Sequence, residues 1–266
     1  MYALVLNLAA IAVYVAATGY LITLIRHQKP IAGPWLNALA ITAVAFHWAG
    51  LYPILVSNEG INFSFFATAS LVSATMNTLL LVSGLRKPLH TLYILFMPIA
   101  VLCTGLLLTT LQSQQYSKLN EGLALHVILS LLAYSFLTIA TAQALLLARQ
   151  THQLRHHQTS GSIKFLPPVQ TMEALLFELL WLGFLILSAS IITGIGFIED
   201  MFAQHLVHKT VFSIIAWLIY AALLAGRHWL GWRGNTAIRF TLGGFAALML
   251  AFFGSKFVLE LVLQIH

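Results

Sequence analysis

The chain has 266 residues, of which 60% are hydrophobic and 8% are charged, and its formal net charge is +6. An ordinary soluble domain carries about 25% charged residues, so this composition excludes a soluble globular protein and indicates a polytopic membrane protein. The positive charge does not indicate nucleic-acid binding, because the basic residues are scattered over separate loops. The single cysteine, Cys103, excludes both an intramolecular disulfide and a CxxC redox pair.

Eight apolar segments follow one another along the chain, and each has about the 20 residues that a membrane-spanning helix needs. They are predicted at 2–25, 35–57, 63–85, 88–112, 123–148, 172–197, 207–227 and 238–262. The first has no basic residue ahead of its apolar run, so we expect a retained helix rather than a signal peptide. The loops are short, and the sequence therefore predicts an all-α fold: one transmembrane domain of eight helices over residues 1–266.

The basic residues of the loops predict the orientation, because cytoplasmic loops carry an excess of Lys and Arg. Ten of the thirteen Lys and Arg residues fall on one side of the predicted spans, and only Lys118, Lys209 and Lys256 fall on the other. The sequence therefore predicts a multi-pass protein of the bacterial inner membrane with both termini on the periplasmic side. The segment around His205 and His208 is expected on that outer side as well.

Polar residues inside spans are costly, so each is a candidate functional residue. His126 lies about one turn inside the outer end of the 123–148 helix, and Ser130, Tyr134 and Thr138 follow at four-residue steps on nearly the same face. A histidine above such a polar stripe could be an axial ligand of a haem iron. A hydrogen bond between helices is the alternative, and the spacing alone leaves both open.

Three further histidines are weighed in the same way. His47 lies beyond the middle of the 35–57 helix toward its outer end, where a hydrogen bond to a neighbouring helix is the ordinary alternative. His205 and His208 are three residues apart just before the 207–227 helix, and could face the same way if that helix begins early. Solvated loop histidines are the alternative for this pair.

Two carboxylates, Glu173 and Glu178, lie in the first turns of the 172–197 helix. Glu173 complements the dipole at the helix N-terminus, whereas Glu178 is expected to face another helix or a polar cavity. The sequence has no phosphate-cradling glycine motif, no HExxH pair and no nucleophile with a plausible base nearby, so we expect no enzymatic activity. Most spans lack a charge at their middle, which argues against an ion-coupled transporter.

Three stretches resemble the membrane proteins of cytochrome c assembly, the CcsA/CcmC-like haem-handling family. They are LHVILSLLAY around His126, HKTVFSIIAWLIYAALLAGRHWLGWRG from His208, and AFFGSKFV from Ala251. The chain is most similar to the smaller HemX-like and YpjD-like branch, whose typical members have eight spans. The resemblance implies haem binding, with haem b as cofactor, in the outer half of a helical bundle that supports c-type cytochrome maturation. It also implies that His126, in its LHV context, is an outer-side haem ligand.

The chain departs from the family pattern at several positions. Where the haem-delivery members have a WGxxWxWDxxE loop, this chain has FIEDMFAQHLVHKTVF, which contains no tryptophan. Ile61 and Ala225 stand where paired inner histidines are expected, and no second outer histidine follows near GSKFVLEL. If one haem is held, the resemblance leaves His47, His205 or His208 as the ligand opposite His126.

The leading hypothesis is therefore an inner-membrane haem-binding and haem-handling factor of c-type cytochrome assembly. Its partners would be the lipid bilayer, haem and other cytochrome c assembly or membrane proteins, and not nucleic acid. The alternative is a regulatory or scaffold membrane protein of the same fold that has lost haem delivery, which the missing tryptophans favour. A small-solute transporter is the second alternative.

Overall fold

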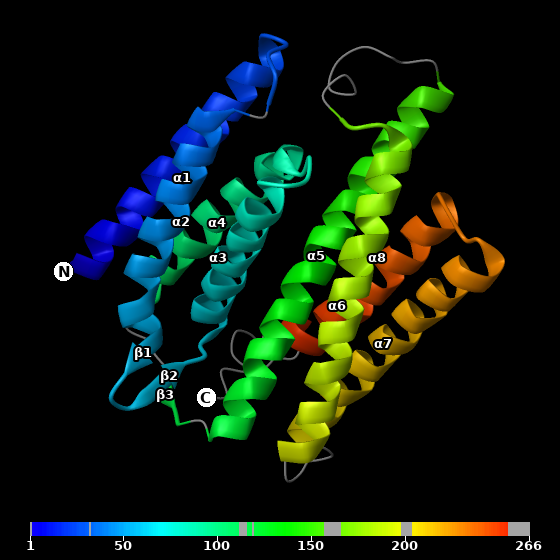
Figure 1. The fold of residues 1–266 in the computed structure, drawn as a ribbon. Helices are drawn as coiled ribbons and strands as arrows, with labels where there is room; N and C mark the ends of the chain where they lie inside the picture. The colour runs from blue at the N-terminus through cyan, green and yellow to red at the C-terminus, as the bar shows by residue number, and fades with distance from the viewer. Residues whose placement is uncertain are drawn as a thin grey trace. The chain divides into compact units, whose positions relative to one another are not determined.

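The computed structural model describes residues 2–31, 33–111, 116–118, 120–156, 166–197 and 204–254, and within them eight helices are long and apolar enough to cross a membrane (Figure 1). The helices are α1 (Tyr2–Arg26), α2 (Pro34–Leu55), α3 (Phe65–Gly84), α4 (Tyr93–Thr109), α5 (Glu121–Arg155), α6 (Val169–Phe197), α7 (Gln204–Leu230) and α8 (Asn235–Met249). A 3₁₀ turn, η1 (His90–Leu92), precedes α4, and a π-helical turn, η3 (Leu250–Gly254), follows α8. The predicted all-α fold with eight spans is confirmed.

Several helices differ from the prediction at their ends, and α5 and α7 bear on the candidate site. Helix α5 continues to Arg155 rather than ending at 148, because the residues beyond the apolar run are mostly good helix formers such as Arg, Gln and Leu. Helix α7 begins at Gln204. The helix thus begins three residues before the predicted 207, so that His205 as well as His208 lies in its first turns.

A small antiparallel sheet in the first half of the chain is not predicted by hydropathy. It consists of β1 (Val56–Ser57), β2 (Gly60–Asn62) and β3 (Tyr116–Ser117), in the order β1-β2-β3. The β1–β2 turn needs Gly60, whose φ of 134° is open to glycine but strained for other residues. Asn62 then ties β2 to α2, since its side-chain amide donates to the Ile54 carbonyl at 3.4 Å.

The helices fall into two compact units, and the first runs from Met1 to Leu119 with α1–α4 and the sheet. Its helices α1 and α2 approach closely where Asn7 donates to the Gly50 carbonyl at 2.8 Å. A Cβ atom at Gly50 would lie 2.8 Å from the backbone nitrogen of Asn7, so only glycine fits there. Small residues at helix contacts are the usual means of close packing in membranes.

The second unit contains α5–α8, and its α5 and α6 lie side by side along much of their length (Figure 1). Three glycines make room for side chains of the facing helix. Gly122 faces the Phe197 ring, Gly183 faces Leu137 and Gly194 faces His126, each at a distance that would be 3.0 Å or less from an added Cβ. In the same unit Gly244 of α8 lies against the ring of Tyr220 from α7. The prediction of a single domain over 1–266 stays a prediction.

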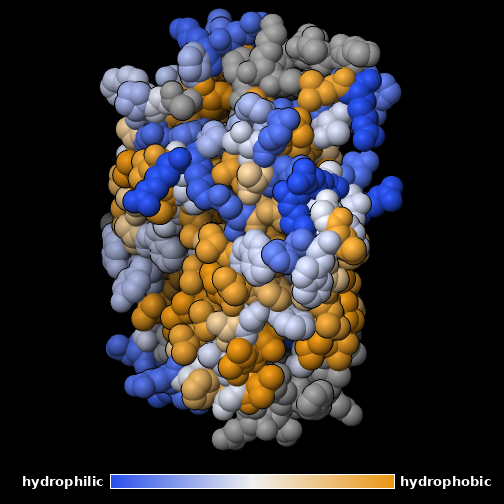
Figure 2. Space-filling view, turned by 45° about the vertical axis from the view of Figure 1, so that its right-hand side comes forward, coloured by the Kyte–Doolittle hydropathy of each residue, from blue (hydrophilic) through white to orange (hydrophobic). Residues whose placement is uncertain are grey.

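The surface is that of a protein that contacts lipid. Hydrophobic residues cover much of the middle of the face seen in Figure 2, and strongly hydrophilic residues gather toward the upper end of that view. Large apolar side chains such as Leu102, Ile192 and Leu218 are more than half exposed. Such exposure is costly in water and favourable against acyl chains.

Candidate functional site

His126 lies in the second turn of α5, where Asn120 starts the helix by accepting a hydrogen bond from the Leu123 amide at 2.8 Å. The His126 ring is partly buried against α6. Its Nδ1 atom lies 2.8 Å from the backbone carbonyl oxygen of Ser190. That carbonyl also accepts from the Thr193 hydroxyl of the same helix at 2.9 Å.

This contact determines which ring nitrogen of His126 carries the proton. A carbonyl oxygen can only accept, so Nδ1 must be the donor, and in the neutral imidazole the lone pair then stays on Nε2. The Ser130 hydroxyl lies 3.4 Å from Nε2, which is long for a hydrogen bond. That hydroxyl has closer partners in the His126 carbonyl at 2.8 Å and the Ser190 hydroxyl at 2.7 Å. Nε2 is therefore available to a further ligand.

Gly194 provides the space in which the His126 ring sits. A Cβ atom at that position would be 3.0 Å from Cε1 and 3.2 Å from Nδ1 of the ring. Neither Ser190 nor Gly194 was singled out from the sequence. A glycine within an apolar helix is a signal for close approach, but the carbonyl of Ser190 leaves no signal because every residue has one.

The polar stripe below His126 divides between two neighbouring helices. Ser130 faces Ser190 of α6, whereas the Tyr134 hydroxyl donates to the sulfur of Met249 in α8. The Tyr134 ring packs against Phe252 at 5.4 Å between centroids. Thr138 donates to the Tyr134 carbonyl of its own helix at 2.7 Å. The stripe thus makes contacts to α6 and α8 and one hydrogen bond within α5 itself.

His47 is fully buried at the centre of the first unit and contacts all three of the other helices there. Its Nδ1 lies 3.3 Å from the hydroxyl of Tyr14 in α1. Its Nε2 lies 3.0 Å from both the Ser70 hydroxyl of α3 and the Thr104 hydroxyl of α4. A haem iron could bind His47 only if the ring gave up some of these hydrogen bonds. The assignment of His47 as a haem ligand stays a prediction, and it belongs to the other unit from His126.

The remaining candidates are placed as follows. His205 and His208 lie in α7, in the same unit as His126, but their side chains are outside the part of the chain that the structure describes. Glu173 pairs with Arg227 of α7, with Nη1 to Oε1 at 2.8 Å, so this carboxylate links two helices and does more than complement the dipole of its own. Glu178 is exposed on α6. Among the described residues, no three His, Cys, Asp or Glu side chains gather into a metal site.

The fold and these contacts define a class: a polytopic helical membrane protein with a partly buried histidine that hydrogen-bonds the neighbouring helix near the start of α5. The sequence profile of the Cytochrome C assembly protein family matches residues 35–263, which is most of the chain. The protein therefore belongs to the cytochrome c assembly family, and the predicted family is confirmed.

Individual relatives agree with this assignment. The chain is 29% identical over 228 residues to the inner membrane protein YpjD of Escherichia coli K12, which covers 84% of this chain and 86% of the relative. It is 28% identical over 239 residues to a 28.8 kDa protein in a nifR3-like 5′ region of Azospirillum brasilense, covering 87% and 83%. It is 27% identical over 93 residues to the cytochrome c biogenesis protein CcsA of Gloeobacter violaceus, covering 34% and 28%. No solved structure matches significantly.

Family membership and the eight candidate spans together support a role in c-type cytochrome biogenesis, in which haem is involved. They also confirm the predicted localisation, since the chain is a multi-pass protein of the bacterial inner membrane.

Proposed function

We propose that this protein binds haem b through the Nε2 atom of His126 and handles it for c-type cytochrome assembly on the outer side of the membrane, without catalysing a reaction. The observation that carries the proposal is the hydrogen bond from His126 Nδ1–H to the Ser190 carbonyl at 2.8 Å. Histidines that bind metals usually donate their other ring N–H to a carbonyl or carboxylate, which fixes the tautomer and the ring orientation.

The residues around His126 fit an axial ligand better than a complete metal site. A haem iron receives its equatorial nitrogens from the porphyrin, so the protein needs to supply one or two side chains only. His126 is partly buried and therefore accessible to a ligand from one side, while Gly194 and Ser190 hold the ring from the other. Bound haem would supply an iron whose reduction potential the axial ligands set.

Helix α7 is the best source of a second ligand. It belongs to the same unit as α5, and both helices begin on the side of the membrane that the charge pattern predicts to be periplasmic. His205 and His208 lie in its first turns, one helical turn apart. We assign the position opposite His126 to one of these two in preference to His47, whose ring nitrogens are engaged within the first unit.

The test is a haem titration of the detergent-purified protein followed by its Soret band. His126→Ala is expected to weaken haem affinity at least about tenfold, the effect typical of damage to a metal site. Gly194→Ala is also expected to weaken haem affinity, because the new methyl group would crowd the imidazole ring of His126. Matched controls are His152→Ala, an exposed histidine on the same helix, and Gly196→Ala, where a Cβ meets nothing within 4 Å. Both controls are expected to leave the titration unchanged.

A wild-type protein that takes up no haem would refute the proposal and favour the alternative of a scaffold or regulatory protein. The absence of tryptophan from residues 197–212 supports that alternative, since the haem-delivery members that the sequence resembles have a tryptophan-rich loop there. It predicts that His126→Ala leaves cytochrome c levels unchanged in cells and that crosslinks to partner proteins form through the loops around 149–165 and 227–239.

A further inference from the structure

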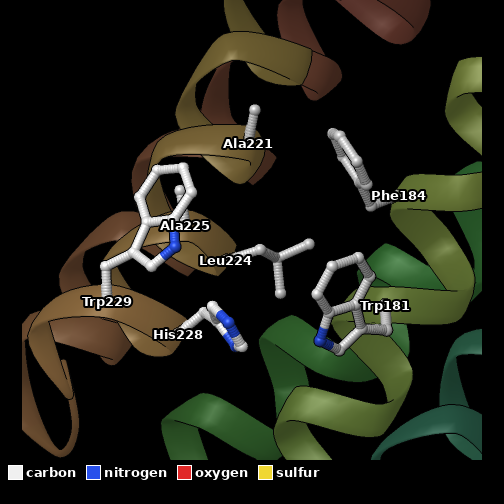
Figure 3. A pocket seen from close by; sticks show the side chains of 7 residues that line it. All are labelled: Trp181, Phe184, Ala221, Leu224, Ala225, His228 and Trp229. Atoms are coloured by element: carbon white, nitrogen blue, oxygen red, sulfur yellow. The ribbon is translucent and has the colours of Figure 1, made fainter.

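A groove lies between α6 and α7 in the second unit, at the end where α7 turns into α8. Its volume is about 430 Å³, within the range of roughly 300–1,000 Å³ of small-molecule sites. The lining residues are Trp181 and Phe184 from α6 and Ala221, Leu224, Ala225 and His228 from α7, with Trp229 at the edge. Figure 3 shows the two α6 rings on one side and the Leu224 and His228 side chains reaching toward them from the other. We call this the α6–α7 groove.

The α6–α7 groove has fixed walls, because side-chain contacts hold the two helices together on both sides of it. Toward the middle of the helices, the Trp217 indole donates to the Ser188 hydroxyl at 2.9 Å. Trp217 also stacks on Phe184 with the ring centroids 5.5 Å apart. Toward the helix ends, Arg227 pairs with Glu173 at 2.8 Å. The small side chains of Ala221 and Ala225 leave the space between these two connections.

The lining suits an acyl chain. It is made of aromatic and aliphatic side chains, and His228 is its one titratable group. Trp229 is 79% exposed and Trp181 is 46% exposed, so both indoles border the opening. Tryptophans concentrate at the level of the lipid headgroups, which places the opening at the edge of the hydrocarbon layer.

The surroundings of the opening are basic. From Gln204 to Gly254 the chain contains no Asp or Glu. The carboxylate of Glu173 offsets Arg227, but Arg233 and Arg239 are both exposed in or beside the α7–α8 turn that His228 precedes. This turn lies on the side with ten of the thirteen basic residues. Basic sites between helices on the cytoplasmic side recognise acidic lipid headgroups.

We propose that the α6–α7 groove is a binding site for an acidic phospholipid, with one acyl chain between Trp181, Phe184 and Leu224 and the phosphate near His228 and the arginines of the α7–α8 turn. The bound lipid fills the gap between the two connections that join α6 and α7. Recognition of the headgroup is electrostatic, so it weakens as ionic strength rises.

The experiment uses the full chain in nanodiscs that contain equal amounts of phosphatidylglycerol and phosphatidylcholine. The protein is then extracted in mild detergent, and the lipids it retains are counted by native mass spectrometry. Wild type is expected to retain phosphatidylglycerol with about a fivefold preference for each basic residue that faces the headgroup. Ala225→Leu, which fills the groove, is expected to lose that lipid, whereas Ala222→Leu on the exposed face of α7 is expected to keep it.

Two exposed substitutions keep the test valid if Ala225→Leu does not fold. Arg233→Gln is expected to reduce the preference for phosphatidylglycerol about fivefold. Arg26→Gln, at the exposed end of α1, is expected to leave it unchanged. Equal retention of the two lipids by wild type, or undiminished retention of phosphatidylglycerol by a folded Ala225→Leu protein, would overturn the proposal.

Discussion

His47 shows how one buried side chain can connect a whole four-helix unit. Each of its contacts goes to a hydroxyl group, from Tyr14, Ser70 and Thr104. A hydroxyl both donates and accepts, so either neutral tautomer of the imidazole finds suitable partners. The Tyr14 ring adds an edge-to-face contact with the His47 ring at 5.7 Å between centroids. The arrangement favours a structural role for this histidine.

We therefore expect His47→Ala to destabilise the protein without removing haem. The substitution leaves a cavity and up to three buried hydroxyls without their partner, which together cost about 2–5 kcal/mol. Thermal unfolding in detergent would show a lower Tm, and His152→Ala, at an exposed site, serves as the control. The haem titration of folded His47→Ala protein should match wild type. A lost or shifted Soret band would instead identify His47 as the second axial ligand.

At the scale of elements, close approach of helices depends on a few glycines. Gly50 of α2 contacts Asn7 of α1 so closely that a Cβ would lie 2.8 Å from both backbone and side-chain atoms. A backbone atom cannot move aside as the end of a flexible side chain can. By contrast, a Cβ at Gly19 of α1 would meet nothing within 4 Å. There is thus no room for an added methyl group at Gly50 of α2, whereas Gly19 of α1 has free space for one.

This contrast gives a prediction with an internal control. Gly50→Ala is expected to separate α1 from α2 and to cost about 1–3 kcal/mol, as overpacking does. Gly19→Ala is expected to be neutral or to stabilise the helix by up to about 1 kcal/mol, because alanine is the better helix former. Tm values of the two variants in the same detergent provide the comparison. Equal Tm values for both would show that the α1–α2 contact tolerates a methyl group.

The sequence predicts the helices well because a span is a long apolar run that can be recognised locally. The strands β1–β3 are each two or three residues long, too short for any periodic pattern to appear. At the site, the position of His126 could be read from its helix, but its hydrogen-bond acceptor could not, because Ser190 is 64 residues away and contributes a backbone atom. The hydroxyl partners of His47 could not be predicted either, because the pairing depends on how each of the four helices is rotated about its own axis.

At the scale of the whole molecule, the orientation in the membrane decides whether the proposed haem site is on the side where it is needed. The excess of ten basic residues over three predicts that the β1–β2 turn and the start of α5 are periplasmic, and that the α7–α8 turn is cytoplasmic. Two exposed asparagines report on the two sides: Asn58 in the β1–β2 turn and Asn235 at the start of α8.

With Cys103 replaced by serine, each asparagine can be changed to cysteine and exposed to a membrane-impermeant maleimide in spheroplasts. Asn58→Cys is expected to be labelled at once, because the reagent reaches the periplasmic face directly. Asn235→Cys is expected to react only after the membrane is permeabilised. The reverse pattern would place His126 at the cytoplasmic face and the basic α7–α8 turn outside. It would contradict the periplasmic haem site proposed for His126 while leaving its affinity for haem to be judged by the titration alone.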